Sequence, residues 1–332
     1  MANRPQPSAR LNYRSFDTRP DHLKHPFLDL IRKSNQPELF KDLYWGELDK
    51  NEPQSIICEF EITPSKRPDG RRAPCPMCGV QNKYCKGSLV YFPGRRVVAA
   101  IGNECSNDGV TRRAKAEWKQ RERVNAEMGI LERELPRLPG IMQHLVHLEP
   151  VANDMETAMR AFRTSCKPLF GALKSSEKQY VGRLAVRADD GTLQEFGFLS
   201  GREFLNTNYK PQRKLAEIER SMRRHVLQDG VDLVEHVLSL DESGTLSATH
   251  SEVTSALKDW EKLLRVLRDC RAFFSNKNLD RLKAFAEAQG WPWCDVQYGD
   301  TRSHRVLTVR TRDCLKGYVA VSIRRFDYLD KL

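Results

Sequence analysis

The segment Cys75-Pro76-Met77-Cys78-Gly79 of this 332-residue chain contains two cysteines separated by two residues. Two further cysteine-containing segments follow, Cys85-Lys86-Gly87 and Gly102-Asn103-Glu104-Cys105. The interpretation of the chain depends on these three segments. Four of the nine cysteines of the chain fall within residues 75–105. The polar, arginine-bearing N-terminus has no apolar region typical of an export signal. In a reducing compartment, cysteines stay free or bind metal. The cluster therefore predicts a metal site.

The donor type and the spacing favour zinc. Zn²⁺ prefers four tetrahedral ligands, and thiolate sulfur is one of its favoured donors. Two cysteines separated by two residues can bind one ion because a tight turn places both sulfurs on the same side. Gly79 permits the left-handed backbone that such a turn needs. We therefore predict a structural Zn²⁺, without an open position for a catalytic water, bound by Cys75, Cys78, Cys85 and Cys105. The alternatives to Cys85 as the fourth ligand are Cys58 and Asp108.

The sequence around these cysteines resembles a treble-clef zinc finger. Residues 88–101 form a predicted hairpin with a turn at Pro93-Gly94, and a predicted helix follows at residues 108–135. A cysteine knuckle, a hairpin and a ligand near a helix start are the parts of a treble clef, although only Cys105 is clear where treble clefs usually carry two ligands. A zinc ribbon describes the spacing nearly as well. The resemblance covers residues 75–125, and it is to a fold group, so it implies no activity.

Two other chemistries are disfavoured by the sequence. A thioredoxin-like cysteine pair belongs after a strand and at a helix start, whereas Cys75 follows a loop. Metal-dependent nucleases built on treble clefs need a histidine beside the hairpin, and none occurs between His25 and His144. The sequence contains no phosphate-binding glycine loop and no hydrolase signature. A protein that is not an enzyme is therefore favoured.

The excess positive charge of the chain is concentrated in the same region. Residues 64–123 hold fourteen Lys or Arg against five Asp or Glu, which is +9 of the formal net charge of +11. Such a patch attracts the phosphates of DNA or RNA without reading sequence, although it can also meet an acidic protein or remain a solvated surface. The predicted phosphate contacts are Arg95, Arg96, Arg112, Arg113 and Lys115. The aromatic residues predicted to be available for base stacking are Tyr84, Tyr91, Phe92 and Trp118.

The predicted fold class is α+β and helix-rich, with a small zinc-bound hairpin–helix module and further β-hairpins in the C-terminal half. Three parts are expected: a flexible basic arm (1–26), a zinc-binding module with flanking helices and a strand (27–140), and a helical domain with two hairpins (141–332). Within the last part we expect a hairpin at 180–199, strands at 305–311 and 317–323, and a helix at 279–288 with Asn278 as its N-cap. Residues 142–173 are expected to be helical, with interruptions near Pro150 and Pro168.

Apolar residues that step by four and three recur in three stretches, for example Val124, Met128, Leu131 and Leu135. This spacing is typical of a packed helix face or of a coiled coil. The second functional hypothesis is therefore a protein scaffold or adaptor that uses the helices at 213–240 and 252–274, with zinc purely structural. No window approaches the ~18 consecutive apolar residues of a membrane helix. A cytoplasmic protein without a membrane partner is expected.

Overall fold

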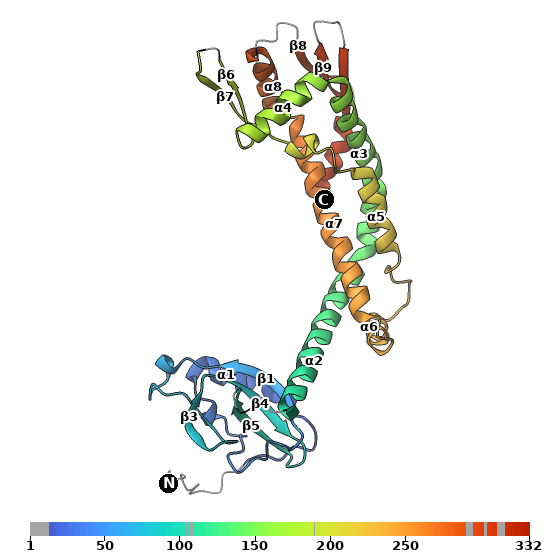
Figure 1. The fold of residues 1–332 in the computed structure, drawn as a ribbon. Helices are drawn as coiled ribbons and strands as arrows, with labels where there is room; N and C mark the ends of the chain where they lie inside the picture. The colour runs from blue at the N-terminus through green and yellow to red at the C-terminus, as the bar shows by residue number, and fades with distance from the viewer. Residues whose placement is uncertain are drawn as a thin grey trace. The chain divides into compact units, whose positions relative to one another are not determined.

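The computed structural model describes residues 13–103, 105, 109–188, 190–289, 295–301, 304–310 and 316–332 (Figure 1). The chain divides into a first unit, Met1–Ala126, and a second unit, Glu127–Leu332. The predicted class, a helix-rich α+β fold with small antiparallel sheets, is confirmed. None of the described helices has both the length and the apolar character needed to cross a membrane.

The first unit is built on an antiparallel sheet with the strand order β1-β4-β5. Its strands comprise Ser55–Glu61, Lys86–Phe92 and Val97–Gly102, so the hairpin predicted at residues 88–101 is confirmed. Every residue of β5, and every residue of β4 after Lys86, is buried. Strands buried on both faces carry nearly unbroken apolar runs, which is what the sequence shows here.

Segments that precede the sheet in the sequence cover part of it. Helix α1 (Lys24–Ser34) places Phe27 in the core, and Phe16 is buried in the same core. The carbonyl of Phe16 accepts a hydrogen bond from the Tyr91 hydroxyl at 2.9 Å. Residues 16–26 therefore belong to the packed unit, whereas residues 1–12 of the predicted flexible arm lie outside the described residues. Short 3-10 helices η1, η2 and η3 comprise Asp21–Leu23, Pro37–Leu39 and Pro64–Lys66.

A second hairpin carries the cysteine pair. Its strands β2 and β3 comprise Ala73–Cys75 and Val80–Tyr84. The Tyr84 side chain lies so close to Gly87 and Gly102 that a Cβ at these positions would come within 2.6 Å and 2.8 Å of it. Glycine at both positions therefore allows the hairpin to pack closely on β4 and β5.

Helix α2 (Gly109–Glu134) confirms the helix predicted at residues 108–135. Ion pairs connect its first part to the rest of the first unit: Lys115 Nζ lies 2.6 Å from a Glu59 carboxylate oxygen, and Lys24 Nζ lies 2.9 Å from one of Glu122. The helix begins after Cys105, which therefore does not lie in its first turn.

The core of the second unit contains three helices, α3 (Leu138–Ser165), α5 (Pro211–Arg223) and α7 (Leu246–Phe273). Val253, Trp260 and Leu267 of α7, which belong to one of the stretches whose apolar residues step by four and three, are buried within this unit. Their spacing therefore corresponds to a packed helix face. The interruption predicted near Pro150 is wrong, because α3 continues through it. Val146, four residues earlier, is 66 % exposed, so water can satisfy the carbonyl that the proline cannot bond.

The hairpin predicted at 180–199 and the two C-terminal strands are present, but a further strand, β8 (Asp295–Asp300), is not predicted by the sequence. With β9 (His304–Arg310) and β10 (Lys316–Ser322) it forms an antiparallel sheet in the order β10-β9-β8. Elements of the second unit not yet placed are η4 (Leu135–Arg137), α4 (Lys167–Gln179), β6 (Arg183–Arg187), β7 (Leu193–Phe198), η5 (Arg202–Leu205), α6 (Leu233–Glu242), α8 (Asn276–Ala288), α9 (Ile323–Phe326) and η6 (Asp327–Lys331).

Asn278 has a different role from the predicted one. Helix α8 begins at Asn276 with Ser275 as its N-cap, so Asn278 lies inside the helix. Its fully buried side chain accepts a hydrogen bond from the Ser200 amide and donates one to the Phe273 carbonyl, both at 2.9 Å. Asn278 thus connects the end of β7 to the end of α7.

Candidate metal centre

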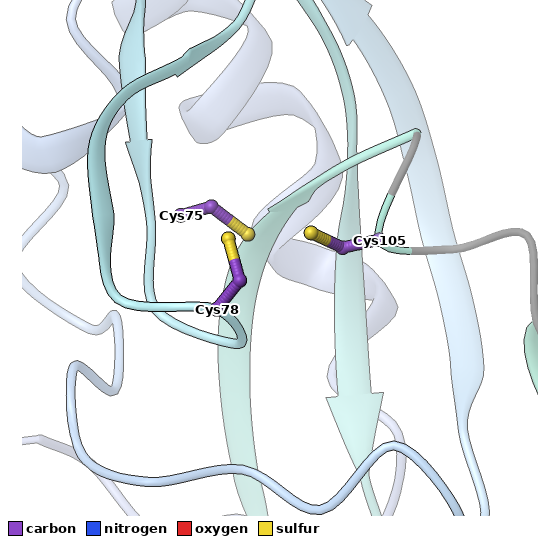
Figure 2. A group of neighbouring side chains, drawn as sticks. All are labelled: Cys75, Cys78 and Cys105. Carbon is purple, nitrogen blue, oxygen red and sulfur yellow. The ribbon is translucent and has the colours of Figure 1, made fainter.

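The turn between β2 and β3 places Cys75 and Cys78 on the same side of the backbone. Gly79 has a φ of +71°, and its amide donates to the Cys75 carbonyl at 2.9 Å. The predicted left-handed glycine after the cysteine pair is therefore confirmed. Figure 2 shows both sulfurs directed toward the same point.

Cys105 reaches this point from the end of β5. Its amide donates to the Gly102 carbonyl at 3.0 Å, in a turn that follows the strand. The sulfur atoms of Cys75, Cys78 and Cys105 all lie within 4.8 Å of one another (Figure 2). A tetrahedral zinc site with Zn–S bonds of ~2.3 Å separates its sulfurs by ~3.8 Å. The three cysteines can therefore hold a metal ion after small side-chain movements.

The three thiols lie close enough for each to affect the ionisation of its neighbours. Partial burial disfavours the Cys78 thiolate, but hydrogen bonds from the Val80 amide and from the other two thiols outweigh it and lower the pKa of Cys78. Burial, together with the neighbouring sulfurs of Cys78 and Cys75, raises the pKa of Cys105 to about 12. One thiolate is thus favoured, and further ionisation is opposed by like charge. A bound divalent cation removes this opposition because it deprotonates the thiols that coordinate it.

The predicted fourth ligand is not part of this group. Cys85 is half-buried between β3 and β4 and does not join the three sulfurs. Cys58 is buried in β1, where burial raises its pKa to about 12, and it is also outside the group. Asp108 lies outside the described residues. The described part of the chain thus brings three protein ligands together, not four.

The predicted phosphate contacts are exposed or half-buried, but several already face carboxylates. Arg95 Nε lies 2.9 Å from a Glu52 oxygen, Arg96 pairs with Asp17, and Lys115 pairs with Glu59. Arg112 and Arg113 lie exposed near the start of α2. The Arg96–Asp17 pair is exposed on both sides. An exposed ion pair contributes ~0–1 kcal/mol, so a phosphate can replace the Asp17 carboxylate.

The aromatic side chains do not offer the predicted stacking surface. Tyr84, Tyr91 and Phe92 are at most 4 % exposed, and Trp118 is partly buried against the same core. The prediction that the first three stack on bases is therefore wrong. These three aromatic residues lie among basic residues in the sequence, but their side chains belong to the hydrophobic core.

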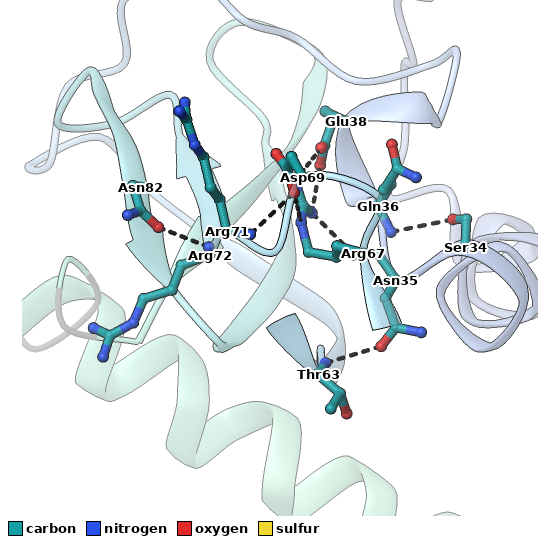
Figure 3. A network of polar contacts seen from close by, with 10 residues as sticks. All are labelled: Ser34, Asn35, Gln36, Glu38, Thr63, Arg67, Asp69, Arg71, Arg72 and Asn82. Carbon is teal, nitrogen blue, oxygen red and sulfur yellow. Dashed lines mark hydrogen bonds and ion pairs between the residues drawn. The ribbon is translucent and has the colours of Figure 1, made fainter. Parts of the chain in front are cut away.

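Arg67 has a structural role that its sequence context does not predict. Its guanidinium is 2 % exposed and lies between two carboxylates, with Nη2 2.5 Å from Glu38 Oε1 and Nε 3.2 Å from Asp69 Oδ1 (Figure 3). Its Nη1 donates to the Asn35 carbonyl at 2.9 Å. Arg67 was counted with the cationic surface, but it is a buried connection between the loop before β2 and the segment after α1. Only the nearby Asp69 was a local signal for this, since Glu38 is distant in sequence.

No family model, curated protein or solved structure matches this chain. The assignment of a function therefore depends on the three-cysteine group and on the charge that surrounds it.

Proposed function

We propose that the first unit binds nucleic acid through phosphate contacts and that a structural zinc ion in the three-cysteine group stabilises it. Three thiol ligands with a left-handed glycine after the first pair support zinc as the cation. The fourth position is then filled by a ligand outside the described residues. Four protein ligands leave no open position for water, so no catalytic step is assigned to the ion.

The observation that carries the nucleic-acid proposal is the concentration of charge. Residues 64–123 carry +9 of the net +11, and the side chains of Arg71, Arg72, Arg112 and Arg113 are exposed. Ionic contacts to phosphates release counterions and are independent of base sequence. Tyr84, Tyr91 and Phe92 are buried and Trp118 is partly buried. The proposed contact is therefore with the backbone of the nucleic acid and not with its bases.

Replacement of four arginines should weaken this binding strongly. The variant carries Gln in place of Arg95, Arg96, Arg112 and Arg113. The slope of log K against log salt is negative, and each lost phosphate contact reduces its magnitude by ~0.9 on duplex DNA, so a reduction of up to ~3.6 is expected. The slope is measured by fluorescence anisotropy of labelled duplex DNA and single-stranded RNA between about 50 and 200 mM salt.

A control variant with the same number of replacements lies in the second unit, with Gln in place of Arg187, Arg213, Arg220 and Arg223. It should bind as the parent does. If the first variant keeps the affinity and the salt slope of the parent, the proposal is wrong. Equal losses in both variants would indicate that only net charge matters.

The exposed apolar face of α6 favours a second candidate function, a protein scaffold that self-associates. Val234 is 55 % exposed and Leu238 is 48 % exposed, and they lie one turn apart on the same helix face. The residue Val231 just before the helix is 44 % exposed. Neighbouring exposed apolar residues are typical of interaction surfaces.

The double variant Val234→Ser, Leu238→Ser should then shift the protein from dimer to monomer. Light scattering at micromolar concentration measures the molar mass of parent and variant. The change Ser239→Ala, at an exposed position on the same helix, is the control and should leave the mass unchanged. A monomeric parent would eliminate self-association through this face.

A further inference from the structure

The second unit contains a cavity of about 280 Å³. It lies between the C-terminal half of α3, the start of α4, η5 and the loop at residues 206–210. Its size is close to the lower end of the range for small-molecule sites, ~300–1,000 Å³. Its wall combines aromatic rings with cationic side chains, and this combination indicates the kind of ligand that it can take.

The apolar part of the wall is preformed. Phe204 is 2 % exposed and stacks on Phe273 with ring centroids 4.4 Å apart. Phe162 lies 5.5 Å from Phe204 and 6.2 Å from Phe170, which also lines the cavity. These rings pack against one another and are already ordered. Ligand binding therefore does not carry the entropy cost of ordering them.

Tyr209, which also lines the cavity, carries a hydroxyl group without a partner in the described part of the chain. The oxygen of Tyr209 is buried, and among the described residues it makes no hydrogen bond. Burial, with the nearby Asp259 carboxylate, raises the pKa of Tyr209 to about 12, so the hydroxyl keeps its proton at neutral pH. Buried hydroxyl groups usually have a partner, and this one is available as a donor.

The edge of the cavity is cationic. Arg160, Arg163 and Lys210 line it together with a single carboxylate, Glu156, which leaves a net charge of +2. Glu156 lies 3.8 Å from Arg160 and also accepts from the Gln212 amide. Within the described ranges, neither Arg163 nor Lys210 has an ion-pair partner.

We infer that this cavity binds a small organic anion, an aromatic group that carries a phosphate or a carboxylate. The ring lies against Phe170 and Phe204, the anionic group lies between Arg163 and Lys210, and the Tyr209 hydroxyl donates a hydrogen bond to the ligand. This inference is independent of the metal site and of nucleic-acid binding, because every residue that carries it belongs to the second unit.

Titration calorimetry of the full chain with phenyl phosphate, benzoate and benzyl alcohol tests the inference. We expect saturable binding of at least one of the two anions and none of the neutral alcohol. The tighter anion identifies the charged group. Failure of both anions to bind at millimolar concentration would overturn the inference, since the ring and the charge are what the cavity is proposed to recognise.

Three variants locate the binding. Arg163→Gln and Lys210→Gln should each weaken it about tenfold, as expected for a lost charged contact. Tyr209→Phe removes a single hydroxyl and should weaken it about two- to tenfold. Lys178→Gln, an exposed lysine of α4 outside the cavity, should bind as the parent does. Unchanged affinity in all of the first three variants, with unchanged melting temperatures, would place the anion elsewhere and refute the assignment.

Discussion

Removal of the cation from the purified protein should loosen the first unit and leave the second unit folded. The three-cysteine group connects the β2–β3 hairpin to the end of β5, and β2 and β3 pair only with each other in the described sheets. A structural zinc contributes ~10–16 kcal/mol in small zinc-finger peptides that have little other core. Here the sheet has its own buried core, so we expect a smaller effect that is concentrated at the hairpin.

Metal analysis and hydrogen exchange measure this effect. The parent should contain one equivalent of zinc, and Cys75→Ser, Cys78→Ser and Cys105→Ser should each lose it. Backbone amides of Val80–Tyr84 should exchange much faster after chelation, while those of α7 keep their protection.

Cys85→Ser is the matched control, because this cysteine is near the group in sequence but outside it in the structure. It should retain the metal. A loss of zinc in Cys85→Ser would instead support the four-cysteine site that the spacing predicts. A parent protein without stoichiometric metal would contradict the zinc proposal altogether.

The sequence correctly predicts that Cys75 belongs to the cysteine group, but it does not correctly predict the position of Cys85. A cysteine pair with two intervening residues followed by glycine is a local pattern, and local backbone geometry suffices to bring its two sulfurs together. The position of Cys85 depends instead on how Tyr84 packs against Gly87 and Gly102. That packing involves strands that are separated in sequence, so spacing alone could not predict it.

The ion-pair partners of the cationic residues could not be predicted from the sequence either. The sequence gives the number of charges but not their partners. Glu52, Asp17 and Glu59 approach Arg95, Arg96 and Lys115 only because the sheet brings distant segments together. The hairpin and the helix that carry these residues were predictable, since apolar alternation and helical periodicity are properties of the local sequence.

Arg67→Met should lower the free energy of unfolding of the first unit by about 2–4 kcal/mol. Removal of one partner from a buried ion pair usually costs ~3–5 kcal/mol, because a charge is left without compensation. Here Glu38 is 26 % exposed and Asp69 is 48 % exposed, so water reduces the penalty for both carboxylates. The Asn35 carbonyl also loses the donor that Arg67 provides (Figure 3).

Urea unfolding, followed by a probe in the first unit, measures this change. Arg71→Met is the matched control, since its side chain is exposed and only its backbone amide bonds to Asp69. We expect the control to remain within ~0.5 kcal/mol of the parent. Arg67→Lys should recover little, because an ammonium group cannot reach both carboxylates and the carbonyl as the guanidinium does.

A second replacement separates a buried ion pair from simple loss of packing. In the double variant Arg67→Met, Glu38→Gln, the carboxylate that was left unpaired becomes neutral, so part of the lost stability should return. If Arg67→Met is no more destabilising than Arg71→Met, the guanidinium does not stabilise the fold. Arg67 would then be only one of the surface cations of residues 64–123. If it is destabilising but Glu38→Gln recovers nothing, the loss comes from packing of the arginine side chain rather than from its charge.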